Sequence, residues 1–253
     1  MKNFYIVLFS CFFIGSEALA LDPSVTPEDK KSSAERFFNA KQIPQPKLSY
    51  EEARNRNVQV EGLSENVSSY KGGRNVIDLM KNCFKVSAHQ PSCSFDTWAK
   101  ILKTAYENGL INSIVRPLNA RNEESTIVHN ILQNVMNLSN EKEQEALLQL
   151  AIEYGANVNY NPGLLIGTPL YKVDCWLRYA ESTPFGKNNK IQNGYLKMIT
   201  ILLAAGAKTE FFNENYDKGE KGNLVSACES KTCKAAKAAY EAAQQQAAQQ
   251  QAA

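Results

Sequence analysis

Cysteines and histidines are the residues of this chain whose types could support chemistry. The chain has six cysteines and two histidines, His89 and His129, so a mechanism that needs several imidazoles is excluded. Cys83, His89 and Cys93 lie close enough in sequence to consider a zinc site. However, no second Cys-x-x-Cys pair and no evident fourth ligand accompany them. We therefore expect neither a metal site nor a cofactor.

A catalytic nucleophile and its base would have to come from Cys175 and His129. The chain contains no Gly-x-Ser-x-Gly, no glycine loop of the kind that binds phosphate and no His-Glu-x-x-His. A lone cysteine on an apolar helix face is usually a packing residue. The sequence therefore predicts no catalytic residues and a protein that is not an enzyme.

The first twenty residues have the pattern of a secretory signal peptide. Lys2 gives a positive start, residues 4–14 are apolar apart from Ser10, and Ala18 and Ala20 are the small residues that a signal peptidase reads. An apolar run of this length is shorter than the roughly 20 residues that span a bilayer. We expect residues 1–20 to be removed and the mature, exported chain to have no membrane span.

Export favours disulfide bonds. Cleavage would leave five cysteines, Cys83, Cys93, Cys175, Cys228 and Cys233. The pairs nearest in sequence are Cys83–Cys93 and Cys228–Cys233, which leaves Cys175 unpaired. Helical residues five positions apart point about 140° away from each other, so the second bridge requires a break in the helix at residues 230–232. Closing so small a loop is worth roughly 2 kcal/mol.

The charge balance and composition limit the class of partner. The 253 residues include 28 Lys and Arg against 26 Asp and Glu, for a net charge of +2, and 43 % are hydrophobic. Nucleic-acid-binding domains usually carry a marked basic excess, so we expect no nucleic-acid partner. The hydrophobic share is sufficient for a buried core.

Residues 21–74 are expected to form a loosely organised, partly disordered leader. Four prolines interrupt its first part, and short helices are expected only near residues 33–40 and 49–55. From residue 75 onward, apolar residues recur at spacings of three and four, as in Trp98, Ile101, Leu102 and Ala105. Strand-like alternation is nearly absent. The pattern predicts an all-α domain of short, paired helices.

Similar sequence signals recur at the ends and starts of these helices. Gly109, Gly155 and Gly206 each follow a predicted helix, where a left-handed cap favours glycine. Thr168 and Pro169 form a helix start, with a hydroxyl cap followed by proline at the first helical position. The three glycines lie 46 and 51 residues apart, which predicts a repeat.

The chain resembles an ankyrin-repeat protein. Residues 201–207 (Ile-Leu-Leu-Ala-Ala-Gly-Ala) and 148–159 match the end of the family's second helix, and 167–171 (Gly-Thr-Pro-Leu-Tyr) match the start of its first. Residues 118–122 resemble its turn. The resemblance implies a solenoid of about three to four helix pairs over residues 75–243. It also implies that His129 hydrogen-bonds the neighbouring loop.

The chain departs from the family in repeat length. Its repeats exceed the usual length of about 33 residues, so insertions are expected at residues 137–143 and 180–194. Residues 223–243 would form a C-terminal cap of two helices, and residues 244–253 an Ala/Gln-rich tail into which the last helix frays.

The resemblance implies protein–protein interaction through the projecting turns. The expected function is that of an exported ankyrin-type binding module with a protein partner, in the periplasm or secreted. The alternatives are a secreted or periplasmic helical enzyme or enzyme inhibitor, and an envelope stress or assembly factor. The expected partner-binding residues are Tyr160, Leu164, Leu165, Phe211, Phe212 and Tyr216. The alternative for Phe211 and Phe212 is that they cover the last helix pair.

The signal peptide generates the first prediction. The exported protein should begin near Leu21, because a signal peptidase would cut after Ala20. N-terminal sequencing of the exported chain measures this directly. Recovery of a chain that still begins with Met1 would remove the argument for export and with it the argument for disulfides.

Overall fold

The structure is a computed structural model that describes residues 47–63, 73–82, 93–116, 124–133, 141–162, 167–183, 189–213 and 223–252. These residues are mostly helical, as the sequence predicts. No helix among them is both long and apolar enough to cross a membrane. The expected signal peptide at residues 1–20 lies outside the described residues, as does the first part of the leader.

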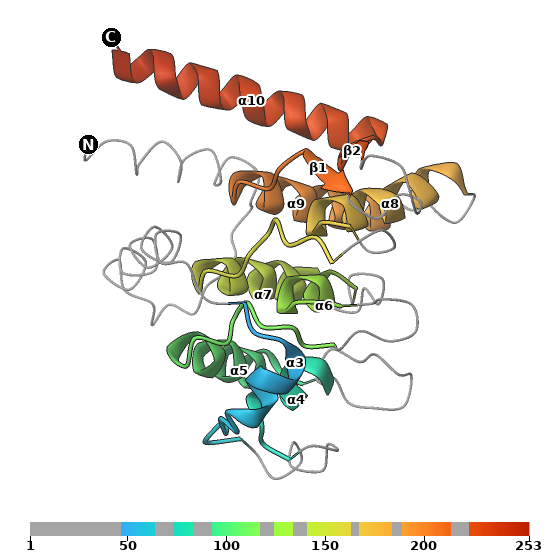
Figure 1. Ribbon diagram of the computed structural model, residues 1–253. Helices are drawn as coiled ribbons and strands as arrows, with labels where there is room; N and C mark the ends of the chain where they lie inside the picture. The colour runs from blue at the N-terminus through green and yellow to red at the C-terminus, as the bar shows by residue number, and fades with distance from the viewer. Residues whose placement is uncertain are drawn as a thin grey trace.

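Helix pairs stacked in layers form the body of the described chain (Figure 1). The pairs are α4 with α5, α6 with α7, and α8 with α9. First helices contact first helices, second helices contact second helices, and α10 packs on α9. In chain order the elements are α3 (Tyr50–Asn55), α4 (Val76–Asn82), α5 (Phe95–Glu107), α6 (Ile127–Gln133), α7 (Glu141–Glu153), α8 (Pro169–Ser182), α9 (Asn189–Ala204), β1 (Glu210–Asn213), β2 (Asn223–Ser226) and α10 (Lys231–Ala252).

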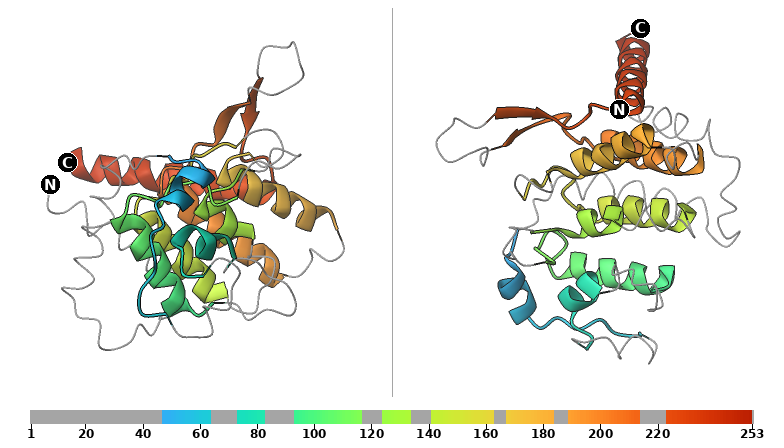
Figure 2. Two further views of the ribbon diagram at one scale, coloured as in Figure 1. Left: turned by 60° about the horizontal axis from the view of Figure 1, so that its bottom comes forward. Right: turned by 90° about the vertical axis from the view of Figure 1, so that its right-hand side faces the viewer.

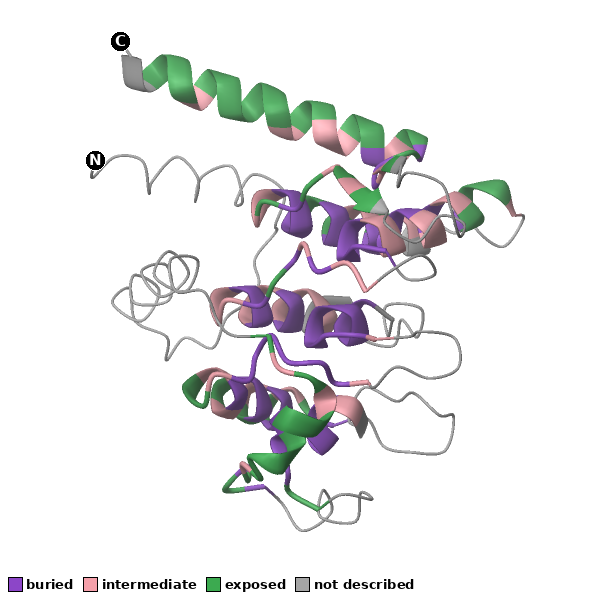
Figure 3. Ribbon diagram, in the orientation of Figure 1, coloured by how far each residue is buried: buried purple, intermediate pink, exposed green. Residues whose placement is uncertain are grey.

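The apolar stripes of the helices form one core that runs through the layers. The predicted stripe Trp98, Ile101, Leu102 and Ala105 is buried along α5. Buried residues face one another within and between the layers, whereas most of α10 is exposed (Figure 3). Each pair therefore depends on its neighbours to cover its apolar faces.

The expected glycine caps are present. Gly109, Gly155 and Gly206 have φ values of 67°, 80° and 82°, in the left-handed region, and each lies two residues after the end of the second helix of a pair. A residue with a side chain is strained in this conformation. The caps turn the chain out of each layer at the same point.

A repeated asparagine contact joins one layer to the next. The Asn112 side chain donates to the carbonyl of Gly155 (3.1 Å) and accepts from the N–H of Asn157 (2.7 Å). Asn159 repeats this one layer later, donating to the carbonyl of Gly206 (3.0 Å) and accepting from the N–H two residues further on (2.7 Å). Each amide thus satisfies a carbonyl and an N–H that no helix pairs.

His129 joins α6 to the loop before α8. Its Nε2–H donates to the carbonyl of Gly167 (3.0 Å), and its Nδ1 accepts from the Thr126 hydroxyl (3.1 Å). The ring is fully buried, so desolvation lowers the pKa of His129 from 6.5 to about 4. Lys172 adds to this effect, and the Gly167 hydrogen bond partly offsets it. The expected contact with the neighbouring loop is present, and the ring is neutral at pH 7.

The later part of the predicted leader is packed on the helices. Ser49 caps α3 in a capping box with Glu52, which places a helix at one of the two expected positions. Ala53, Val60 and Leu63 are buried in the common core. The packed domain therefore begins before residue 75, where its start was expected.

The C-terminal region differs from the expected pair of helices. Asn223–Ser226 is a strand that pairs antiparallel with Glu210–Asn213, so residues 223–243 do not form two helices. α10 instead continues to Ala252 without a break at residue 243. The expected insertion at residues 180–194 largely lengthens helices, since α8 ends at Ser182 and α9 begins at Asn189. Residues 137–140 of the other insertion lie outside the described residues.

His129 generates a prediction about pH. Between pH 6.5 and about pH 4 the unfolded chain binds the proton of this imidazole and the folded chain does not. The free energy of unfolding should therefore fall as the pH is lowered through this window, by up to about 3 kcal/mol from this group. Urea denaturation followed by circular dichroism at several pH values measures the loss.

The matched variant is His129→Gln, whose amide can still donate to Gly167. It should lack the part of the pH dependence that this imidazole contributes, while the carboxylates still titrate in both proteins. Parallel stability curves for the two proteins between pH 4 and 6.5 would contradict the buried neutral histidine.

Candidate interaction surface

The β1–β2 hairpin projects from the stacked helices and carries an exposed apolar pair. Figure 2 shows the two strands extending away from the third layer. Phe212 and Leu224 are direct cross-strand partners, exposed by 54 % and 67 %. Successive side chains of a strand alternate between faces, so exposed Glu210 lies on the same face as Phe212. We call Glu210, Phe212 and Leu224 the outer face of the hairpin.

The opposite face of the hairpin rests on α8. The Phe211 ring meets the Tyr171 ring edge-on, with centroids 5.2 Å apart. Tyr171 in turn lies against Gly167, where an added Cβ would clash with its ring. Phe211 was expected to bind a partner. Its half-buried ring instead packs against the Tyr171 ring.

Polar contacts fix the hairpin on the side of the preceding loop. The side-chain amide of Asn161 donates to the carbonyl of Phe212 (3.2 Å). Beyond the end of the strands, the Ala227 N–H donates to the carbonyl of Thr209 (2.8 Å). The outer face is thus presented at a defined position relative to the second and third layers.

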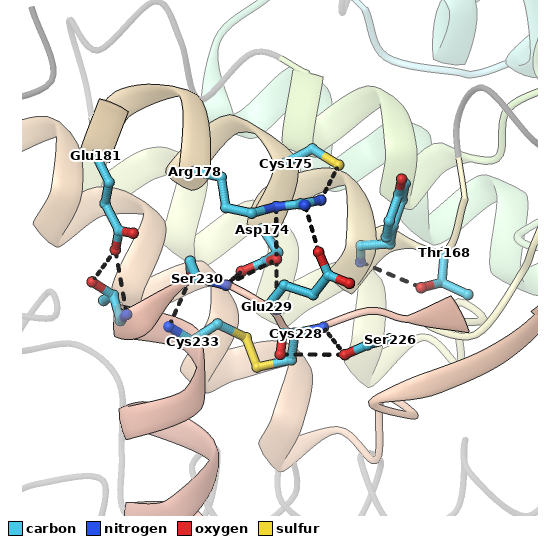
Figure 4. A network of polar contacts seen from close by, with 12 residues as sticks. Thr168, Asp174, Cys175, Arg178, Glu181, Ser226, Cys228, Glu229, Ser230 and Cys233 are labelled. Carbon is cyan, nitrogen blue, oxygen red and sulfur yellow. Dashed lines mark hydrogen bonds and ion pairs between the residues drawn. A yellow bond between two sulfur atoms is a disulfide. The ribbon is translucent and has the colours of Figure 1, made fainter. Parts of the chain in front are cut away.

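Asp174 on α8 holds the segment through which β2 continues into α10. Its carboxylate is fully buried and accepts from the N–H groups of Glu229 (2.8 Å) and Ser230 (3.1 Å). Arg178 lies 3.3 Å from this carboxylate and 2.6 Å from that of Glu229 (Figure 4). A buried carboxylate is tolerated only when it is paired in this way.

The Cys228–Cys233 disulfide closes the same segment, with Cα atoms 5.4 Å apart. The Ser230 hydroxyl accepts from the N–H of Cys233 (3.0 Å). α10 begins at Lys231, directly after Ser230. Cys228 thus lies before the helix, so the bridge spans the start of α10. The expected break at residues 230–232 between two helices is wrong, because a strand precedes α10 and residues 231 and 232 belong to its first turn. Cys93 is disulfide-bonded, but its expected partner Cys83 lies outside the described residues.

Cys175 and His129, the residues considered as a nucleophile and its base, each hydrogen-bond other residues. Cys175 is a free, half-buried cysteine whose sulfur accepts from Arg178 Nη2 (3.0 Å). Both nitrogens of His129 are occupied by Thr126 and Gly167. In the described part of the chain, these contacts do not support a thiol–imidazole pair.

Tyr160 was expected to bind a partner, but its side chain is part of the interior. It is buried, and its hydroxyl donates to the Glu124 carboxylate (2.6 Å). Burial and this carboxylate raise the pKa of Tyr160 above its ordinary value. The Lys47 amine lies 4.3 Å from the ring centroid. Of the other expected partner-binding residues, Leu164, Leu165 and Tyr216 lie outside the described residues.

Leu224 was not identified from the sequence. The signal that could have indicated it is a pair of short β-favouring runs, Phe211-Phe212 and Leu224-Val225, on either side of a segment with two glycines. Each strand has four residues, which is too few for alternation to stand out against helical spacing.

A small polar pocket lies at the other end of the described domain. It encloses about 280 Å³ between α3 and α4. Asp78 at its wall is occupied by Arg54 Nε (3.1 Å) and the Tyr50 hydroxyl (2.9 Å). No group of three metal-ligating side chains occurs among the described residues. The hairpin is the stronger candidate because its apolar side chains remain exposed.

Comparisons with protein-family models, with curated proteins and with solved structures found no match to this chain.

The buried Asp174 generates a prediction about stability. Asp174→Ala would leave two N–H groups and Arg178 without their carboxylate, so the free energy of unfolding should fall by about 2–4 kcal/mol. Urea denaturation at pH 7 measures it. The control is Glu229→Gln at an exposed ion pair, which should cost less than about 1 kcal/mol. Equal losses in both variants would show that the buried carboxylate is not the main contact.

Proposed function

We propose that this chain is an exported protein–protein interaction module of the ankyrin type, and that the outer face of the hairpin is where it meets a protein partner. The observation that carries the proposal is the cross-strand pair Phe212 and Leu224, exposed on a projecting and anchored element.

Exposed apolar residues need an explanation when they are adjacent. Single exposed apolar side chains are normal on a protein surface. Phe212 and Leu224, however, are directly opposite each other, where cross-strand Cβ atoms lie about 4.5–5.5 Å apart. Because their backbone is fixed by neighbouring loops, little conformational freedom is lost when they bind. An aromatic side chain of this kind is a common interface anchor.

The arrangement of the layers supports the ankyrin-type solenoid. Helices stack first on first and second on second, and the asparagine contact recurs from one layer to the next. The Thr168 cap with Pro169, and the contact from His129 to the next loop, also follow the family's pattern. In such a stack the turns between pairs form the usual contact surface.

Two features support export. The Cys228–Cys233 disulfide is compatible with an oxidising compartment, and residues 1–20 have the composition of a signal peptide. The proposed location is the periplasm or the extracellular medium. Cys175 accepts a hydrogen bond from Arg178, and His129 donates one to the Gly167 carbonyl. These separate contacts support a binding role without catalysis.

The test of this function replaces both outer-face residues with a strand-favouring polar residue, as Phe212→Thr with Leu224→Thr. The tagged, exported chain would be used to capture partners from the periplasm and from the extracellular medium. The affinity for a recovered partner would then be measured by calorimetry. The double variant should bind about 100-fold more weakly, since two interface anchors are lost.

The control is Tyr179→Gln, which removes an equally exposed ring from α8, away from the hairpin. It should bind like the parent chain, and both proteins should keep the parent's unfolding free energy within about 0.5 kcal/mol. Normal binding by the double variant would place the partner surface elsewhere. A large loss of stability would show that these side chains belong to the core.

A further inference from the structure

The pairing pattern of the β1–β2 hairpin decides which main-chain groups point outward. The Ala227 N–H donates to the Thr209 carbonyl (2.8 Å), so these two residues form a hydrogen-bonded pair of the ladder. In an antiparallel ladder, such pairs alternate with pairs that exchange no hydrogen bond. In the observed register, the next hydrogen-bonded pair is therefore Phe211 with Val225.

The residues between these pairs direct their main-chain groups away from the partner strand. They are Glu210 and Phe212 on β1, and Leu224 and Ser226 on β2. The Phe212 carbonyl accepts from the Asn161 amide (3.2 Å), as expected for a group that points outward from β1. The outward groups of Leu224 and Ser226 therefore lie on the opposite edge of the hairpin, away from the loop that carries Asn161.

This outer edge of β2 is an unpaired strand edge. Among the described residues, no group hydrogen-bonds the main-chain N–H or C=O of Leu224 or Ser226. The side chains of β2, Asn-Leu-Val-Ser, include no charge, and the hairpin extends away from the helices (Figure 2). Proteins usually cover or charge such an edge, because it pairs readily with another strand. The edge of β2 is thus able to accept one more strand.

The outer face defines the side chains that such a strand needs. In an antiparallel third strand, the residues opposite Leu224 and Ser226 lie on the outer face, two positions apart. The residue opposite Leu224 extends the apolar row that begins with Phe212, so it should be apolar. The residue opposite Ser226 lies about 10 Å from Glu210, across a short side chain. An arginine or lysine there reaches the exposed Glu210 carboxylate, and its charge is complementary.

We propose that the partner of the proposed function binds by strand addition, in which an extended segment of that protein pairs antiparallel with the outer edge of β2. From its N-terminus, the segment has a basic residue opposite Ser226, one intervening residue and an apolar residue opposite Leu224. Main-chain hydrogen bonds supply affinity, and the two side chains supply specificity. The inference rests on the proposed function, to which it adds the kind of partner segment and its direction.

The first measurement is hydrogen exchange of the free, exported chain, followed for each residue by nuclear magnetic resonance. The amides of Phe211 and Val225 should be protected, and those of Leu224 and Ser226 should exchange at least about 10-fold faster. Protection of Leu224 and Ser226 that rises with protein concentration would assign the edge to a second copy of the chain. Protection independent of concentration would show that the chain itself covers the edge. Either result would overturn the inference.

The second measurement adds the synthetic peptide acetyl-Thr-Arg-Thr-Ile-Thr-amide, which has the required order and spacing of basic and apolar residues. It should shift the amide signals of Leu224 and Ser226 with a dissociation constant of about 1 mM, since so short a strand buries little area. Methylation of the isoleucine nitrogen removes the donor to the Leu224 carbonyl and should weaken binding by about 10-fold. The matched control carries the methyl group on the central threonine, whose N–H points away from β2. It should bind within about twofold of the parent peptide.

A pair of variants tests the same hydrogen bonds from the side of the chain. Leu224→Pro removes the outward N–H but no hydrogen bond within the hairpin, and proline is tolerated at such edge positions. It should weaken peptide binding by about 10-fold, whereas Leu224→Val should bind within about threefold of the parent chain. Protection of the Val225 amide verifies that the hairpin persists in each variant. The methylated peptides provide the same test on an unchanged chain.

Two results of the peptide titration would overturn strand addition. One is equal binding of the two methylated peptides, and the other is the absence of shifts at Leu224 and Ser226 up to about 5 mM peptide. No captured partner is needed for these measurements. Strand addition can therefore fail while Phe212 and Leu224 still prove necessary for partner capture, so the inference and the proposed function are tested separately.

Discussion

A pair of short helices cannot bury both of its apolar faces by itself, so every layer of this protein depends on the next one. α5 and α7 are covered by the second helices of neighbouring layers, and α9 is covered by α10. Within the described chain, α10 has no second helix beside it in its own layer. Its counterpart over α8 is the segment between β2 and α10. There Asp174, Arg178 and Glu181 contact residues 229–232. The last layer is thus closed by one helix and a set of polar contacts.

The position of the hairpin follows from this closure. One strand continues from the cap of α9, and the other continues into the segment that Asp174 holds. Phe211 faces inward onto Tyr171, which leaves Phe212 to face outward because side chains alternate along a strand. The exposed pair is therefore a consequence of how the stack ends, and its backbone is supported on both sides.

The parts of the fold that depend on neighbours in sequence could be predicted, and those that depend on distant residues could not. The apolar stripe of α5, the glycine caps and the Thr168 start are all local signals, and each is present. Tyr160 was assigned to the surface because its burial depends on Glu124 and Lys47, which are far away in sequence. The hairpin was missed because its strands are short and pair across a long connection.

The close contact between Gly167 and the Tyr171 ring links the inside of the molecule to its surface. A single methyl group at residue 167 would meet that ring, and the ring supports Phe211 at the base of the hairpin. Displacing it would tilt β1 and with it the side chains on the other face. Substitution of the buried Gly167 is therefore constrained by the geometry of the hairpin's outer face, although the two are not in contact. Homologues that lack this glycine should also have replaced Tyr171.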